Sequence, residues 1–213
     1  MPERHIEAPS SPLGRISWVL FEWGRNPYVL VITVYVYATY FTRDVVGDPV
    51  RGQALWAAFQ GYAGLLVAVS APFLGAIADA GGRRKPWVLF FSLLLAGSSA
   101  ALWYGLPGGA GLGLAGLGFV IALANLAYDG SLVFHGAMLP TLVPRARLGR
   151  WSGFGYASGN FAGIVLLLFV LIFIYLPAQP LFGLDRASHQ HERIDRKSTR
   201  LNSSHVSESR MPS

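Results

Sequence analysis

Charged and amide side chains near the start of the first apolar stretch are the residues best placed to do chemistry. Glu22 and Arg25 are three positions apart, so a helix puts them on one face, and Asn26 follows directly. Ionised groups inside a membrane helix usually pair with one another or face a water-filled cavity. The pattern fits a solute or proton site on a translocation path. An interfacial ion pair, with Arg25 extended toward lipid phosphates, fits the same spacing.

A second candidate is Asp129, which lies in a later apolar stretch beside Asn125 and Tyr128. A carboxylate within a membrane span is costly and is a functional candidate by default. It could carry a proton, or it could be a structural partner for nearby arginines. His135 follows in the same stretch without a second metal-ligating residue, so we interpret it as structural.

Enzyme signatures are missing from the sequence. There is no cysteine, which excludes disulfides, thiolate metal sites and cysteine nucleophiles. There is no Walker motif, no HExxH pair and no Gly-x-Ser-x-Gly elbow. The stretch GLGLAG at residues 111–116 matches a dinucleotide fingerprint only formally, because it opens an apolar helix and follows no strand. We therefore expect no enzymatic activity, no cofactor and no metal.

The composition is that of a polytopic membrane protein. Hydrophobic residues make up 53% of the chain and charged residues 13%, whereas soluble domains carry about 25% charge. The apolar residues occur in blocks, and the cations that give the net charge of +6 lie between them. The bilayer therefore accounts for the basic residues, and we expect no nucleic-acid partner.

Five apolar blocks are long enough to cross a bilayer core, which takes about 20 residues of helix. Residues 86–128 carry no charge but are too long for one span, and the Gly- and Pro-rich stretch at 105–109 divides them. We predict an all-α fold with a bundle over residues 17–184, whose membrane helices cover about 17–41, 54–78, 86–104, 111–139 and 151–176.

Loop charges predict the orientation of these helices. Cations gather in the loops around residues 83–85 and 145–150, while the other loops are balanced or uncharged. The positive-inside rule then places both basic loops and the N-terminal segment 1–16 in the cytoplasm. We expect the protein to lie in the inner (plasma) membrane of a bacterium. The N-terminal segment lacks the apolar core and cleavage site of a signal peptide.

Small residues recur along two of the predicted helices and indicate faces for close helix packing. The set on the final predicted helix is Gly155, Gly159 and Gly163. The longer set, on the helix over 54–78, is Ala57, Gly61, Gly64, Ala68, Ala71 and Gly75.

Residues 185–213 differ from the rest in being polar and rich in serine, which predicts disorder. The stretch DRKSTRLNSSH at 195–205 is similar to the translation of a sequencing adapter. On that interpretation the tail is artefactual from about residue 192 and the natural protein continues differently. A natural flexible tail is the alternative.

Several motifs resemble one transporter family. The stretch GAIADAGGRRK at 75–85 resembles the loop between helices 2 and 3 of the major facilitator superfamily. FEWGRNPY at 21–28, HGAMLP at 135–140 and GRWSGFGY at 149–156 are similar to the vacuole-effluxer-like branch. The likeness covers about residues 17–176 and departs at Arg25, a position that is usually uncharged in this branch.

The resemblance implies an incomplete N-terminal six-helix half of a transporter, whose C-terminal half is its missing partner. It implies alternating access with a site between the halves, and a link of this branch with amino-acid export. The expected function is secondary active transport of a small polar solute such as an amino acid; the alternative is a non-transporting membrane scaffold or sensor derived from a facilitator fold. The resemblance also implies a cytoplasmic gate in which Asp79 is close enough to pair with the cations, formed by Gly75, Asp79, Gly82, Arg83, Arg84 and Lys85.

Overall fold

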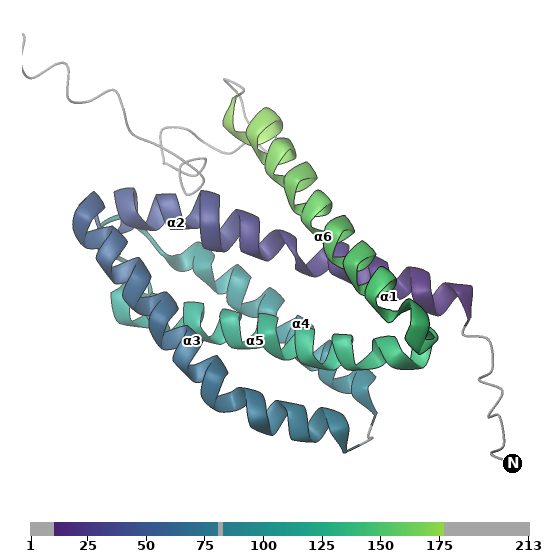
Figure 1. The fold of residues 1–213 in the computed structure, drawn as a ribbon. Helices are drawn as coiled ribbons and strands as arrows, with labels where there is room; N and C mark the ends of the chain where they lie inside the picture. Colours follow the sequence, from purple (N-terminus) through teal and green to yellow (C-terminus); the bar gives the residue numbers. More distant parts are fainter. Residues whose placement is uncertain (1–10, 81–82, 177–213) are drawn as a thin grey trace, which may run out of the picture.

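The structure of the chain is a computed structural model that describes residues 11–80 and 83–176, and these residues form a helical bundle without strands (Figure 1). Four apolar helical stretches are long enough to cross a membrane: Pro49–Asp79, Arg84–Tyr104, Gly113–Leu142 and Arg145–Ile174. The protein is therefore an all-α polytopic membrane protein. Gly82 of the expected gate and the predicted tail lie outside the described residues.

The first predicted span is helical but interrupted. It consists of α1 (Pro12–Arg25), the π-helical η1 (Val29–Tyr35), α2 (Val36–Tyr40) and the π-helical η2 (Phe41–Val45). The α-helical pattern stops where Pro27 lacks the N–H that a continuing helix requires. The last regular bond runs from the Asn26 N–H to the Glu22 carbonyl at 3.0 Å. The break explains why this span is not among the four long, uninterrupted ones.

The long helices begin and end at residues suited to these positions. In α3 (Pro49–Asp79), the Asp48 carboxylate accepts hydrogen bonds from the backbone N–H groups of Val50 and Arg51, at 2.9 and 3.0 Å. Between α4 (Arg84–Ala101) and α5 (Gly113–Leu142), the chain turns through η3 (Leu102–Tyr104) and η4 (Pro107–Gly109). Four glycines with positive φ make this turn possible, namely Gly108, Gly109, Gly111 and Gly113.

Packing is centred on α5, against which both α3 and α4 lie, while α1 contacts α5 and α6 (Leu148–Val170, continued by η6, Leu171–Tyr175). An aromatic stack joins α4 to α5, with the Trp87 and Phe134 ring centroids 5.3 Å apart and those of Phe91 and Phe134 5.8 Å apart. At the other end of the bundle, the Tyr40 hydroxyl donates to the Gly105 carbonyl at 2.8 Å, which ties the first span to the α4–α5 turn.

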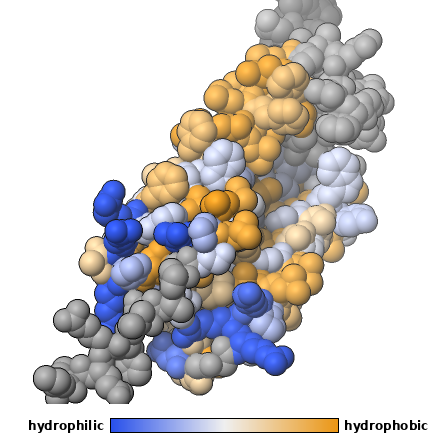
Figure 2. Space-filling view, turned by 90° about the vertical axis from the view of Figure 1, so that its right-hand side faces the viewer, coloured by the Kyte–Doolittle hydropathy of each residue, from blue (hydrophilic) through white to orange (hydrophobic). Residues whose placement is uncertain are grey.

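The surface of the bundle is largely apolar. Large side chains such as Phe73, Leu93 and Phe119 are more than half exposed. Figure 2 shows hydrophobic residues along much of the visible face, with hydrophilic residues gathered toward one end. Exposed apolar surface of this extent is what lipid contact requires.

The two sets of small residues differ in their surroundings. On α6, Gly155, Gly159 and Gly163 are buried, and a Cβ on each would press against the first span, as we expected. On α3 the expected packing face is wrong for the described residues, because Gly61 and Gly64 are exposed with nothing near them. Instead α3 packs on α5 through another face, where Phe59 lies against Gly118.

Gly155 offers a test of the α1–α6 contact. A Cβ at this position would run into the Trp18 ring, so Gly155→Ala is expected to destabilise the bundle by about 1–3 kcal/mol through overpacking. The control is Gly153→Ala on the same helix, where nothing lies within 4 Å of the added atom and where alanine is favoured by about 0.5–1 kcal/mol. Unfolding in mixed detergent micelles measures both, and equal stability of the two variants contradicts the packing.

Candidate functional site

Glu22 and Arg25 form a buried ion pair on α1. Arg25 Nη2 lies 2.6 Å from Glu22 Oε2, and the two residues are 5% and 4% exposed. The guanidinium of Arg25 lies over the Tyr128 ring, 4.6 Å from its centroid. Arg25 is thus directed into the bundle, and the alternative of an interfacial arginine extended toward lipid phosphates does not describe this geometry.

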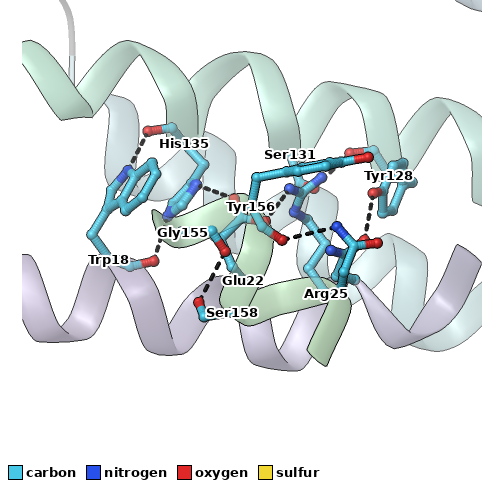
Figure 3. A network of polar contacts seen from close by, with 11 residues as sticks. Trp18, Glu22, Arg25, Tyr128, Ser131, His135, Gly155, Tyr156 and Ser158 are labelled. Carbon is cyan, nitrogen blue, oxygen red and sulfur yellow. Dashed lines mark hydrogen bonds and ion pairs between the residues drawn. The ribbon is translucent and has the colours of Figure 1, made fainter. Parts of the chain in front are cut away.

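His135 of α5 is the third member of the cluster, and its side chain is only 1% exposed. Its Nδ1 lies 3.1 Å from Glu22 Oε1, at ion-pair distance but without the alignment of a hydrogen bond. Its Nε2 lies 3.1 Å from the Trp18 carbonyl, and the Trp18 indole N–H donates to the His135 carbonyl at 3.1 Å. The Trp18 ring stacks on the imidazole (Figure 3). These contacts join α1 to α5 at one point.

The glycines of α6 close the third side of the cluster. A Cβ on Gly159 would lie 2.7 Å from Asn26 Nδ2 and 3.2 Å from the Glu22 Cβ, so only glycine allows this approach. On the α5 side, the Tyr128 hydroxyl donates to Asn26 Oδ1 at 3.3 Å. We define the charged cluster as Glu22, Arg25, Asn26 and His135, enclosed by α1, α5 and α6.

Several donors in the charged cluster have no partner in the described residues. They are Arg25 Nε, Arg25 Nη1 and Asn26 Nδ2, all nitrogen donors without an acceptor. A buried donor left unsatisfied costs about 1–3 kcal/mol. The excess of donors over acceptors suits a ligand rich in acceptor oxygen, such as a carboxylate.

Asp129 lies apart from the ion pair. It is partly buried and interacts electrostatically with Arg25, but no hydrogen bond or ion pair joins it to another described residue. Its neighbour Asn125 donates to Gln60 Oε1 of α3 at 3.1 Å. Of the residues singled out in the sequence, Glu22, Arg25 and Asn26 therefore come together, with Asp129 at the margin.

The sequence did not place His135 beside Glu22. The histidine is 117 positions from Trp18, with which it exchanges two backbone contacts, and no local spacing relates it to Glu22. The signal available was chemical, since a histidine in an apolar span is as unusual as a carboxylate. The described residues contain no group of three or more His, Asp or Glu side chains that could hold a metal ion.

A cavity of about 560 Å³ adjoins Arg25 between the first span and α4. Its walls are apolar except for Arg25, Tyr28, Ser92 and Ser99. This volume lies within the range of small-molecule sites.

The expected gate is only partly assembled in the described residues. Arg84 donates to the Ala78 carbonyl through Nε at 3.2 Å and to the Ala137 carbonyl through Nη1 at 2.8 Å. It therefore joins the C-terminal parts of α3 and α5 through their backbone, and the described residues contain no ion pair between Asp79 and the cations of the turn. Asp79, Arg83 and Lys85 are exposed.

The ion pair can be tested by charge removal. Glu22→Leu leaves the buried Arg25 without its carboxylate and is expected to cost about 3–5 kcal/mol. The double variant Glu22→Leu/Arg25→Leu removes both charges and should recover much of that loss. Unfolding of the purified protein in mixed micelles gives the comparison, and purely additive losses would show that the two charges are not coupled.

Comparison with known proteins places this arrangement in a family context. The chain is 27% identical over 167 residues to a Bacillus subtilis (strain 168) protein described as the uncharacterized MFS-type transporter YxiO. The match covers 76% of this chain and 38% of that relative, so the chain spans well under half of the relative's length. No solved structure matches the chain.

The family profile described as "Vacuole effluxer Atg22 like" matches residues 43–149. This range includes the basic turn, Asp129 and His135, while Glu22 and Arg25 precede it. The match covers half of the chain, and together with the transporter relative it shows the family to which the chain belongs. The chain is a member of the vacuole effluxer Atg22-like family, within the major facilitator transporters.

Proposed function

We propose that this chain is part of a secondary active transporter that moves a small polar solute by alternating access. The observation that supports the proposal is the charged cluster, which lies between helices whose other faces are apolar. Ionised groups inside a membrane protein are expensive and mark substrate and ion pathways. Membership of a transporter family supports the same conclusion.

The unpaired donors of Arg25 and Asn26 favour a solute that carries a carboxylate, with amino acids as the leading class. A carboxylate accepts two parallel hydrogen bonds from a guanidinium, and such charge-assisted bonds are about twice as strong as neutral ones. Glu22 occupies only Nη2 of Arg25, so Nε and Nη1 remain available. Nε–H and Nη1–H point to different sides of the guanidinium, so we place one oxygen of the solute carboxylate against Nη1, with Asp129 near the amino group as a further pathway residue.

The complete protein is proposed to contain a second half that faces this one. We propose further that the N-terminus and the basic turns lie on the cytoplasmic side of a bacterial plasma membrane. The exposed Asp79, Arg83 and Lys85, together with Gly75 and Gly82, then form a gate against the second half. Arg84 contributes by anchoring the turn to α3 and α5.

Transport can be measured with the full-length protein in proteoliposomes. The probe is a pool of radiolabelled amino acids, taken up under an imposed proton gradient. Excess unlabelled amino acids should compete for uptake, whereas their amides, which lack the carboxylate, should not. Arg25→Met is expected to weaken uptake about tenfold or more through the loss of charge-assisted hydrogen bonds. Undiminished uptake by Arg25→Met, or equal competition by the amides, contradicts the carboxylate assignment.

The gate has a separate test in the same liposomes. Asp79→Asn keeps the side-chain shape but removes the charge and should abolish most uptake. Arg51→Gln is the control, because Arg51 is exposed near the start of α3, at the other end of that helix, and should transport normally. Unchanged uptake by Asp79→Asn rules against the gate.

A further inference from the structure

The protonation of His135 can be read from its two ring nitrogens. Nε2 lies 3.1 Å from the Trp18 carbonyl oxygen. A backbone carbonyl only accepts hydrogen bonds, so Nε2 must carry a proton. Nδ1 is then the nitrogen that is free to gain or lose a proton.

That second nitrogen lies 3.1 Å from Glu22 Oε1. If Nδ1 were bare and Glu22 ionised, a lone pair and a carboxylate oxygen would repel each other in a site that excludes water. One proton removes the conflict, either on Nδ1 as an ion pair with the carboxylate or on Glu22 facing the neutral ring. Both forms contain the same number of protons and have the same net charge.

We infer that Glu22 and His135 share one proton, carried by either residue of this close ion pair, and that the pair is the proton-coupling site of the transporter. The inference rests on the proposed function, which it deepens by naming the coupling ion. The proton joins α1 to α5, because the pair is the charged contact between them (Figure 3). Its loss sets Nδ1 against the carboxylate and loosens that contact.

The groups around the Glu22–His135 pair favour the gain and loss of this proton. Facing Glu22 from its own helix is Arg25, which binds the other carboxylate oxygen. Facing His135 are the Trp18 and Phe21 rings, both uncharged, with centroids 4.6 and 4.5 Å away. From α5, Tyr128 lies under Arg25, and the Asp129 carboxylate acts on Arg25 from a distance.

The side toward α6 is neutral in this cluster. That helix presents Gly155 and Gly159 to α1, and it also carries the exposed Tyr156, which interacts electrostatically with Tyr128. No cation from α6 therefore competes for the carboxylate in the described residues.

The charge balance links this proton to the solute. With the shared proton, Glu22, Arg25 and His135 carry a net charge of one positive unit, and without it they are neutral. A solute carboxylate bound at Arg25 is attracted more strongly by the positive form. By reciprocity the bound carboxylate then favours the proton, so proton and solute bind together and are carried in the same direction.

The shared proton can be observed directly by nitrogen NMR of the full-length protein, labelled with ¹⁵N-histidine, in lipid bilayers. His135→Gln identifies the signals of this residue. We expect the Nδ1 signal of a nitrogen that carries the proton or lies beside a protonated Glu22. In Glu22→Gln the amide can donate to Nδ1 and accept from Arg25, so the fold is kept while the shared proton is absent.

A second arm measures protons and solute in the same proteoliposomes, with a pH-sensitive dye inside and the amino-acid pool outside. Wild-type protein should acidify the lumen as the solute enters, while Glu22→Gln should show proton movement no greater than protein-free liposomes. Asp48→Asn is the control, because it removes a carboxylate outside the cluster and keeps an oxygen that caps α3. It should acidify the lumen as wild type does.

The outcomes separate this inference from the proposed function. A bare Nδ1 facing an ionised Glu22 overturns the shared proton, and so does normal proton movement in Glu22→Gln. Solute uptake would still support a transporter in either case. A shared proton with no uptake of any amino acid supports the proton site and overturns the assignment of amino acids as the solute.

Discussion

Burial of charge in an apolar surrounding is the constraint on which this structure depends. Glu22 and Arg25 are almost fully enclosed, and each charge is stabilised there by the other. Because the two residues pair, the face of α1 that carries them points into the bundle, where His135 of α5 lies beside them. The third helix that covers them must approach closely, which requires small residues at the contact. The glycines of α6 satisfy that demand. The positions of three helices thus follow from two charges.

The interrupted first span belongs to the same arrangement. The α-helix ends at Arg25, within the charged cluster, and resumes as a π-helix from Val29. Proline removes the hydrogen bond there, so the backbone at the cluster does not follow a regular helix. Departures of this kind in membrane helices are tolerated where the chain is enclosed by other protein segments, as it is between α5 and α6.

Much of the fold was predictable because lipid restricts the alternatives. The lengths of the apolar blocks and the Gly- and Pro-rich breaks between them were enough to predict an all-α polytopic fold. The turn motifs were enough to recognise the family. Periodicity marks a face of a helix but not its neighbour. The same kind of small-residue pattern is buried on α6 and exposed on α3. Whether such a face is buried depends on which helix packs against it, and local sequence does not give that contact between distant segments.

The candidate site was likewise only partly predictable from the sequence. Glu22, Arg25 and Asn26 could be grouped from the sequence because they are neighbours on one helix. His135 could not be joined to them, since its partners lie on another span. The expected pairing of Asp79 with the basic turn is not seen in the described residues, where Arg84 instead donates to backbone carbonyls of Ala78 in α3 and Ala137 in α5.

The two ends of the first span are attached to different parts of the bundle. Its N-terminal half is held by His135 and the α6 glycines, while Tyr37 and Tyr40 attach its far half to carbonyls of the α4–α5 turn. The π-helical stretch lies between these attachments. The two halves of the span are therefore held by separate sets of contacts, so weakening the contacts at the charged end leaves the tyrosine hydrogen bonds to the turn in place.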